Sequence, residues 1–229
     1  MERKMRKISL SQIVVFIVLF ATIISLGLGG TWLLFGQLEL GDFRGIALVL
    51  SAGILCFIFA LIVYRLFLWK FPLEAGDIKK DSKKEFIYHV YLLFFLLVFY
   101  PVMRSGFTPL PVMRLIYLML GAKLGDNTYS SGIILDPLFV EVGNNTLIGQ
   151  YALIVPHALE NERLGHYKVT IGNNVTIGAH AVVMANVTIE DNALVATGAI
   201  VTKGTYISAG EVWAGVPAKC IKKSQIEGA

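Results

Sequence analysis

Charged residues are scarce in this chain: they make up 16% of its 229 residues, whereas an average soluble protein has about a quarter. Hydrophobic residues make up 55%. This composition excludes an intrinsically disordered chain and also an ordinary soluble domain with one core. Cysteine is scarce too, since only Cys56 and Cys220 occur, far apart and the first in an apolar run. A disulfide scaffold is therefore excluded, and a reducing compartment is favoured.

The charges that are present divide unevenly. Residues 1–123 hold 14 Lys and Arg against 7 Asp and Glu, and residues 124–229 hold 6 against 9. The two parts therefore carry +7 and −3, which sum to the formal charge of +4. A nucleic-acid-binding protein would carry its basic residues on the folded domain, whereas here they accompany the apolar part. This pattern favours a membrane surface and excludes nucleic acid as the expected partner.

Two uncharged runs, residues 8–38 and 45–64, are long enough to cross a bilayer, which takes about 20 residues. The first is too long for a secretory signal, which is the alternative. Lysines and arginines flank the pair on one side: Arg3, Lys4, Arg6 and Lys7 before it, and Lys70, Lys79, Lys80, Lys83 and Lys84 after it. This bias predicts a transmembrane helical hairpin over residues 1–70 with both ends in the cytoplasm.

A third apolar run, residues 86–103, has 18 uncharged residues. Basic residues flank it on both sides. Pro101 lies near its end and Gly106, Pro109 and Pro111 follow it, and we expect these four residues to break the chain. We therefore predict a lysine-rich linker and interfacial or re-entrant helices over residues 71–120, with a third span as the alternative. His89 lies in this run, where an ionisable group is a functional candidate, but its closeness to Lys84 favours a histidine at headgroup level.

Aliphatic residues recur at every sixth position in the last hundred residues. The series runs through Val142, Ile148, Ile154, Ile171, Ile177, Val183, Ile189, Val195, Val201 and Ile207, with Trp213 in the same phase. A helix would need a period of 3.6 and a half-buried antiparallel sheet a period of 2, so both are excluded. The period of six predicts a parallel β-helix in which three hexads form one triangular coil and coils stack about 4.8 Å apart.

Corner residues support this interpretation. Three positions after seven of the ten aliphatic residues stands an asparagine or glycine, which tolerates a left-handed backbone: Asn145, Asn174, Asn186, Asn192, Gly198, Gly204 and Gly210. We expect an all-β domain over residues 121–223, with about five coils, and a tail over residues 224–229.

The repeat resembles that of the hexapeptide-repeat acyltransferases, galactoside O-acetyltransferases in particular. The matching phrases are VTIGNNVTIGAH at 169–180, IVTKG at 200–204 and the closing AGVPAK at 214–219. The resemblance covers about residues 121–223 and leaves out the apolar half. It implies a left-handed parallel β-helix, a homotrimer, and transfer of an acetyl group from acetyl-CoA to a hydroxyl or an amine.

The hexad frame breaks once, between Ile154 and Ile171, which are 17 rather than 18 residues apart. In the family the catalytic histidine precedes a loop that leaves the β-helix at this place, and His157 occupies that position. Acyl transfer needs a base for the acceptor proton, and an imidazole with a pKa near 6.5 suits that role, with a backbone N–H for the oxyanion. The alternative is a corner histidine that only tolerates the turn.

Three further residues are expected at the acceptor site. Asp136, one coil before His157, is expected to orient that histidine or bind the acceptor, or else to cap a turn before Pro137. His166 and Tyr167 lie in the excursion and are expected to reach the acceptor, although a solvated histidine is the alternative for His166. His180 is expected at the surface. These histidines lack the closely spaced pair that a zinc site of this fold would need, so no metal is expected.

Residues for the acyl donor are expected in two groups. Gly178, Ala196 and Ala214 are spaced by one coil and should form a flat column that the pantetheine arm of acetyl-CoA can approach. The alternative is that this hexad position is small throughout. Lys203 and Lys219 are expected near the CoA phosphates, unless they are solvated surface charges.

The sequence thus predicts an anchored, homotrimeric, acetyl-CoA-dependent O-acetyltransferase whose catalytic domain faces the cytoplasm. Membrane lipid is an expected partner, and the expected acceptor is a hydroxyl of a saccharide or of a lipid-linked glycan precursor. The alternatives are an N-acetyltransferase acting on an amino sugar, and a non-enzymatic trimeric β-helix that scaffolds an envelope assembly.

Overall fold

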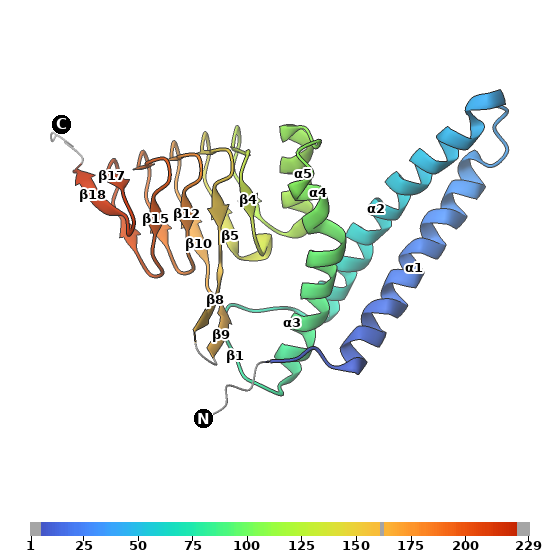
Figure 1. Cartoon of the computed structure of the whole chain (residues 1–229), viewed down its shortest axis with the longest axis horizontal. Helices are drawn as coiled ribbons and strands as arrows, with labels where there is room; N and C mark the ends of the chain where they lie inside the picture. The colour runs from blue at the N-terminus through green and yellow to red at the C-terminus, as the bar shows by residue number, and fades with distance from the viewer. Residues whose placement is uncertain (1–5, 161–162, 224–229) are drawn as a thin grey trace. The chain divides into compact units, whose positions relative to one another are not determined.

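A computed structural model of the chain describes residues 6–160 and 163–223. The chain divides into two compact units: Met1–Leu73 with Lys80–Tyr100, and Glu74–Lys79 with Pro101–Ala229. The first unit is helical and the second is built mainly of short strands, as Figure 1 shows. Arg3, Lys4 and the predicted tail 224–229 lie outside the described residues.

Among the described residues, three helical stretches are long and apolar enough to cross a membrane: Leu10–Phe35, Gly41–Lys70 and Lys83–Arg104. The first is α1, and the second comprises the short η1 (Gly41–Phe43) and α2 (Arg44–Lys70). These two match the runs from which a hairpin was predicted. They approach closely at Gly27, where an added Cβ would lie 2.2 Å from the Sγ atom of Cys56. A small residue at this position therefore permits the close packing of the two helices.

The third stretch consists of α3 (Lys83–Phe94), the π-helical η2 (Phe95–Phe99) and α4 (Tyr100–Arg104). The expectation that Pro101 breaks the chain is wrong, because the helix continues to Arg104. Proline lacks an N–H donor, and a π-helical turn, in which the Tyr100 N–H bonds to the Phe95 carbonyl, precedes it and shifts the hydrogen-bond pattern. The break falls later, at Gly106, which has a φ of +70°, and at Pro109, the N-cap of α5 (Leu110–Leu120).

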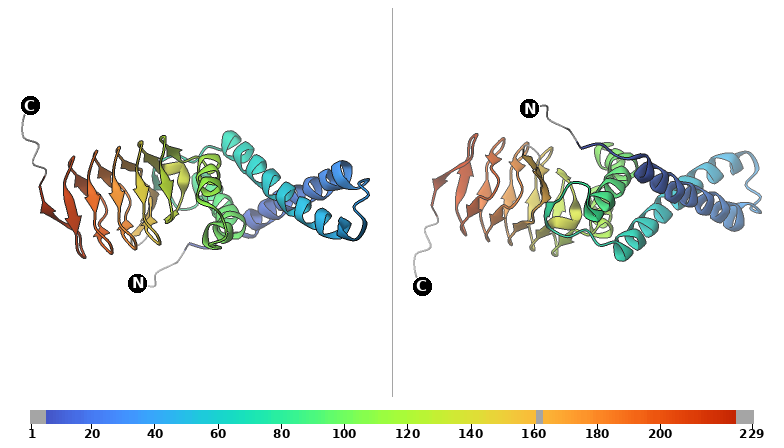
Figure 2. Two further views of the ribbon diagram at one scale, coloured as in Figure 1. Left: turned by 90° about the horizontal axis from the view of Figure 1, so that it is seen from above. Right: turned by 90° about the horizontal axis from the view of Figure 1, so that it is seen from below.

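The second unit contains three sheets of parallel strands whose successive coils stack in register (Figures 1 and 2). The first sheet holds β2 (Lys123–Leu124), β5 (Val140–Val142), β10 (Val169–Ile171), β13 (Thr188–Ile189) and β16 (Tyr206–Ile207). The second holds β3 (Tyr129–Ser130), β6 (Leu147–Ile148), β11 (Thr176–Ile177), β14 (Leu194–Val195) and β17 (Val212–Ala214), and β18 (Lys219–Lys222) closes it as an antiparallel strand. The third holds β4 (Ile133–Ile134), β7 (Leu153–Ile154), β12 (Val182–Val183) and β15 (Ile200–Val201).

The hexad pattern is confirmed at both of its positions. The aliphatic residues from Val142 to Ile207 point into the β-helix, and each is 5% exposed or less. The seven predicted corner residues all have φ angles between +53° and +76°, so their asparagines and glycines occupy the left-handed region. Burial of one aliphatic side chain per hexad and a left-handed corner three residues later together produce the triangular coil.

One excursion leaves the coils, at the place where the hexad frame breaks. It is a hairpin of β8 (His157–Glu160) and β9 (Arg163–His166), and β1 (Gly76–Ile78) joins it as a third, antiparallel strand. The sequence did not predict β1, because three residues with one aliphatic side chain have no period. The predicted linker 71–120 is thus divided: residues 74–79 and α5 belong to the β-helix unit.

Helix α5 covers the first coil of the β-helix. Its buried face consists of Met113, Ile116, Tyr117 and Leu120. Carbonyl oxygens of the first coil have no preceding coil to bond, and Arg114 donates to those of Leu124, Gly125 and Thr128. The Tyr117 hydroxyl donates to the Gly132 carbonyl and accepts the Ile134 N–H, both at 3.1 Å. This helix therefore satisfies the exposed backbone edge of the repeat.

Candidate active site

His157 and Asp136 form the centre of the candidate site. Strand β7 ends at Ile154, and the chain leaves the coil three residues later with His157 at the start of β8. Asp136 follows β4, which lies beside β7 in the same sheet, so one coil of stacking brings the two side chains together. The His157 Nδ1 atom hydrogen-bonds to the Oδ2 atom of Asp136. The alternative role of Asp136 as a turn cap finds no support, since its side chain makes no capping hydrogen bond to η3 (Pro137–Phe139).

This hydrogen bond sets the chemistry of the imidazole. A carboxylate only accepts hydrogen bonds, so Nδ1 carries the proton and Nε2 keeps its lone pair. The hydrogen bond from His157 to Asp136 raises the pKa of His157 above its ordinary value, burial opposes that change, and attraction to the carboxylate adds to it. The His157 side chain is 37% exposed and that of Asp136 only 4%. The imidazole of His157 is therefore accessible to solvent and is hydrogen-bonded to a buried carboxylate.

His166 lies on the other side of Asp136. It is opposite His157 in the β8–β9 hairpin and is fully buried. Its ring stacks on Phe139 with ring centroids 4.5 Å apart, and its Nε2 atom is 3.9 Å from the Oδ1 atom of Asp136. The structure thus places His166 against the carboxylate rather than on the surface where an acceptor would bind. It restricts the position of Asp136 from the side opposite His157.

Tyr167 follows His166 in sequence, but its side chain contacts Asp77 and Lys203. Its backbone N–H donates to the carbonyl of Pro156, and its hydroxyl donates to the Asp77 carboxylate of β1. The ring lies directly over Gly165, where an added Cβ would be 2.8 Å from the Tyr167 hydroxyl. The hydrogen bond to Asp77 raises the pKa of Tyr167. Asp77 is a neighbour of Tyr167 that sequence reasoning missed.

Lys203 contacts the same excursion. Its Nζ atom is 2.8 Å from the Oε2 atom of Glu160 and 4.6 Å from the centre of the Tyr167 ring. The ion pair with Glu160 raises the pKa of Lys203. The structure therefore brings Lys203 to the β8–β9 hairpin, two coils beyond the strand that precedes His157. An exposed pair of this kind contributes little stability.

The three small residues predicted for the acyl donor do lie in one column. The Gly178 N–H donates to the Val195 carbonyl and the Ala196 N–H to the Trp213 carbonyl, so these two residues and Ala214 stack in successive coils. A Cβ on Gly178 would lie 2.4 Å from the Thr197 nitrogen, so the coil spacing itself requires glycine there. Lys219 lies opposite Ala214 on β18 and is exposed.

The remaining histidines are separate from this cluster. His180 is exposed at a corner with a φ of +57° and stacks on Tyr151, as its predicted surface position requires. Within residues 6–160 and 163–223, no group of three or more His, Cys, Asp or Glu side chains has a geometry that could hold a metal ion.

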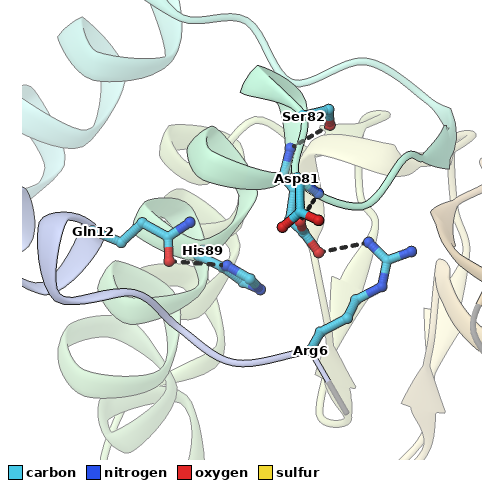
Figure 3. A network of polar contacts seen from close by, with 6 residues as sticks. Arg6, Gln12, Asp81, Ser82 and His89 are labelled. Carbon is cyan, nitrogen blue, oxygen red and sulfur yellow. Dashed lines mark hydrogen bonds and ion pairs between the residues drawn. The ribbon is translucent and has the colours of Figure 1, made fainter. Parts of the chain in front are cut away.

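His89 belongs to a polar network in the helical unit, shown in Figure 3. Its Nδ1 atom is 3.1 Å from the Oε1 atom of Gln12, and the histidine is only 5% exposed. Nearby, Arg6 donates to Glu85 at 2.7 Å, and the Asp81 N–H donates to the other Glu85 oxygen at 2.6 Å. The network connects the start of α1 to α3. His89 is therefore held between α1 and α3, and its position at headgroup level stays a prediction.

Fold and site together define a repeat β-helix with an Asp–His pair where a hairpin leaves the coils. Residues 168–203 match the family described as bacterial transferase hexapeptide (six repeats), which confirms the predicted resemblance for the repeat. No protein of curated function matches the chain.

Solved structures with some likeness include three acetyltransferases. One is a hexapeptide-repeat-containing acetyltransferase from Vibrio cholerae, with 21% identity over 44% of this chain and 62% of that chain and a TM-score of 0.41. A galactoside acetyltransferase in complex with coenzyme A has 23% identity over 73% and 82%, with a TM-score of 0.40. A maltose O-acetyltransferase from Clostridium difficile 630 has 17% identity over 70% and 96%, with a TM-score of 0.41. This chain thus spans less than two thirds of the Vibrio cholerae protein. Because the TM-scores are low, the β-helix is established by the strand pairing of this chain and not by these similarities.

Proposed function

We propose that this chain is an acetyl-CoA-dependent acyltransferase with His157 as its general base. The observation that carries the proposal is the pairing of an accessible imidazole with the buried carboxylate of Asp136, at the place where the β8–β9 hairpin leaves a hexapeptide-repeat β-helix. This function accounts for the pair, whereas a scaffold would not need it. Left-handed coils and a homotrimer are part of the proposal and rest on the family resemblance.

The reaction uses His157 and Asp136 in separate roles. Nε2 of His157 accepts the proton of the acceptor hydroxyl as its oxygen attacks the thioester carbonyl of acetyl-CoA. The carbon–sulfur bond of the resulting tetrahedral intermediate then breaks, and the CoA thiolate takes the proton from the imidazolium. Asp136 holds the imidazole in the tautomer that leaves Nε2 free and stabilises its positive charge in between. His166 acts as a positioning residue, because it touches Asp136 rather than a substrate.

The donor is proposed to bind along the coils. The column of Gly178, Ala196 and Ala214 offers exposed backbone to the pantetheine arm, and Lys219 provides positive charge near its last coil. Lys203 can bind a CoA phosphate only by leaving Glu160. Tyr167 and Asp77 lie on the exposed face of the hairpin and are proposed to contact the acceptor.

The proposed setting is the cytoplasmic face of a membrane, with α1 and α2 as the anchor. The acceptor is proposed to be a hydroxyl of a saccharide or of a lipid-linked glycan precursor. An amino sugar is the second candidate acceptor, because the same base would serve an amine. A non-enzymatic trimeric scaffold remains the alternative to an enzyme.

Release of the free CoA thiol tests the proposal. The full-length protein in detergent is offered acetyl-CoA and a membrane extract as acceptor. We expect His157→Asn to lower the rate by about 10²- to 10⁴-fold, the usual contribution of a general base. His180→Asn is the matched control, because asparagine tolerates its left-handed corner, and it should retain the rate. Equal rates for the two variants would favour the scaffold. So would a wild-type rate of thiol release no higher than that of His157→Asn with every extract tried.

A further inference from the structure

The outer face of α5 is apolar. Leu110, Val112, Leu115 and Met119 are between 39% and 58% exposed on this face, and Phe107 in the preceding turn is 92% exposed. The one charged residue of the helix, Arg114, directs its guanidinium to backbone carbonyls of the first coil. A helix at a water-facing surface normally carries polar residues on its outer side. The outer face of α5 has none, so water is a poor partner for it.

Chain connectivity indicates which partner covers this face. Only residues 105–109 separate α5 from Lys83–Arg104, a helix apolar and long enough to enter a bilayer. A helix joined to such a segment by so short a connection lies close to the lipid surface. The absence of charge on the outer face suits the apolar side of the headgroup region.

Strand pairing adds a constraint on Lys83–Arg104. Strand β1 precedes this helix and β9 follows it, yet Gly76–Ile78 hydrogen-bonds to β9 over three residue pairs. Both ends of the helix therefore connect to one sheet, which can lie on only one side of a membrane. A complete crossing by this helix would separate the two strands. Half of its most apolar window is also buried inside the protein, against 17% and 11% for the other two helices.

The candidate active site lies at the end that α5 covers. Helix α5 packs against η3, which begins directly after Asp136, and Tyr117 of α5 bonds to both Gly132 and Ile134 on the strand leading to that aspartate. Asp136 belongs to the first coil and His157 to the second. At about 4.8 Å per coil, both residues lie within roughly 10 Å of the coil end beneath α5.

From these observations we infer that the outer face of α5 rests in the lipid headgroup region, so that the β-helix meets the membrane with its first coil and His157 faces acceptors held at that surface. The second part rests on the proposed function, and the first does not. The acceptor class that fits is a molecule with a lipid portion in the bilayer and a hydroxyl at headgroup level. Later coils extend away from the lipid.

A fluorescent label tests the lipid contact directly. The full-length protein carries Cys56→Ala, Cys220→Ser and one new cysteine, either Leu115→Cys or Thr170→Cys, labelled with the environment-sensitive dye NBD. Thr170 is exposed on the third coil and serves as the matched control. The probes are phosphatidylcholine–phosphatidylglycerol vesicles with and without bromine on the acyl chains. We expect quenching by brominated lipid at position 115 and none at 170.

Each other outcome overturns the lipid contact. Blue-shifted emission at position 115 without quenching would show that a second copy or the chain's own helices cover α5. Emission typical of water would show that nothing does.

A second measurement tests the acceptor class. Leu115→Glu should lower CoA thiol release with membrane extract in vesicles but leave acetyl-CoA binding unchanged, while Thr170→Glu should alter neither. Full turnover by Leu115→Glu would overturn the inference about the acceptor. Quenching without any His157-dependent thiol release would retain the lipid surface and remove the proposed function, so the two failures are distinguishable.

Discussion

Asp136 and His157 are 21 residues apart in the chain, and the stacking of coils makes them neighbours. Sequence reasoning could propose their proximity because the hexad register relates Asp136 to Ile154, three residues before His157. The burial and stacking of His166 on Phe139 could not be predicted, since they depend on how the hairpin folds back onto η3. Asp77 was missed for the same reason: nothing local in the sequence directs it to Tyr167.

The raised pKa of His157 leads to a prediction on pH dependence. The base must be neutral to act, so kcat/KM for acetyl-CoA should fall on acidification through a pKa above the ordinary 6.5. Asp136→Asn removes the charge that raises this pKa and retains burial, which lowers it. The acidic limb should therefore move to lower pH while the maximal rate falls at least about tenfold. Asparagine tolerates the left-handed backbone of this position, and an unmoved limb would show that Asp136 does not pair with the base.

Among the elements, the strands of the repeat were the most predictable, whereas the packing of α5 on the first coil was not predictable. A strand of two or three residues is recognisable only because its aliphatic residue recurs every six positions. Helix α5 is apolar on both sides, so its pattern alone does not say which face meets the β-helix. Its inner face became clear only when Arg114 and Tyr117 were found to bond the backbone of the first coil. The apolar pattern predicted an interfacial helix and did not indicate that α5 covers the first coil.

Tyr117 allows the contribution of this cap to be measured. Its buried hydroxyl makes two hydrogen bonds, and burial raises the pKa of the phenol to about 12, so both bonds persist through neutral and moderately alkaline pH. Tyr117→Phe leaves the Ile134 N–H and the Gly132 carbonyl without this partner. We expect a loss of about 1–3 kcal/mol in the free energy of unfolding.

Urea unfolding of the full-length protein in detergent, followed by circular dichroism in the β region, provides the measurement. Tyr151→Phe is a matched control, because that tyrosine is 74% exposed at a corner of the second coil. Equal stability of the two variants would mean that α5 does not stabilise the coil edge.

At the scale of the whole molecule, the two compact units alternate along the chain. Segment 74–79 leaves the helical unit, joins the sheet of the excursion, and the chain then returns to α3. Composition divides the chain once, near residue 120. It therefore cannot show that residues 74–79 belong to the β-helix unit while the residues on both sides belong to the helical unit. The outline of an apolar half and a repeat half was predictable, but the place where the halves interlace was not.

This interlacing predicts membrane topology. If α1 and α2 cross and Lys83–Arg104 does not, the N-terminus and the β-helix share one side. A membrane-impermeant maleimide should then modify a cysteine at Thr170 and one at Lys7 from the same side of sealed inside-out vesicles. Modification of the two from opposite sides would show a third crossing and contradict the pairing of β1 with β9 in the membrane. A cysteine at Asp42, in the loop between α1 and α2, should react from the other side only.

The repeat ends at β18, and coils could be added before this closing strand. The first coil packs under α5 and carries Asp136, whereas at the other end β18 returns on β17 and carries Lys219, which is proposed to bind the acyl donor. Strands of successive coils are 18 residues apart, as Thr188 and Tyr206 are, so a duplicated unit of that length preserves the register of everything before it. Gene duplication or design could therefore change the number of coils one at a time without moving the Asp136–His157 pair, and each added coil would lengthen the proposed donor column.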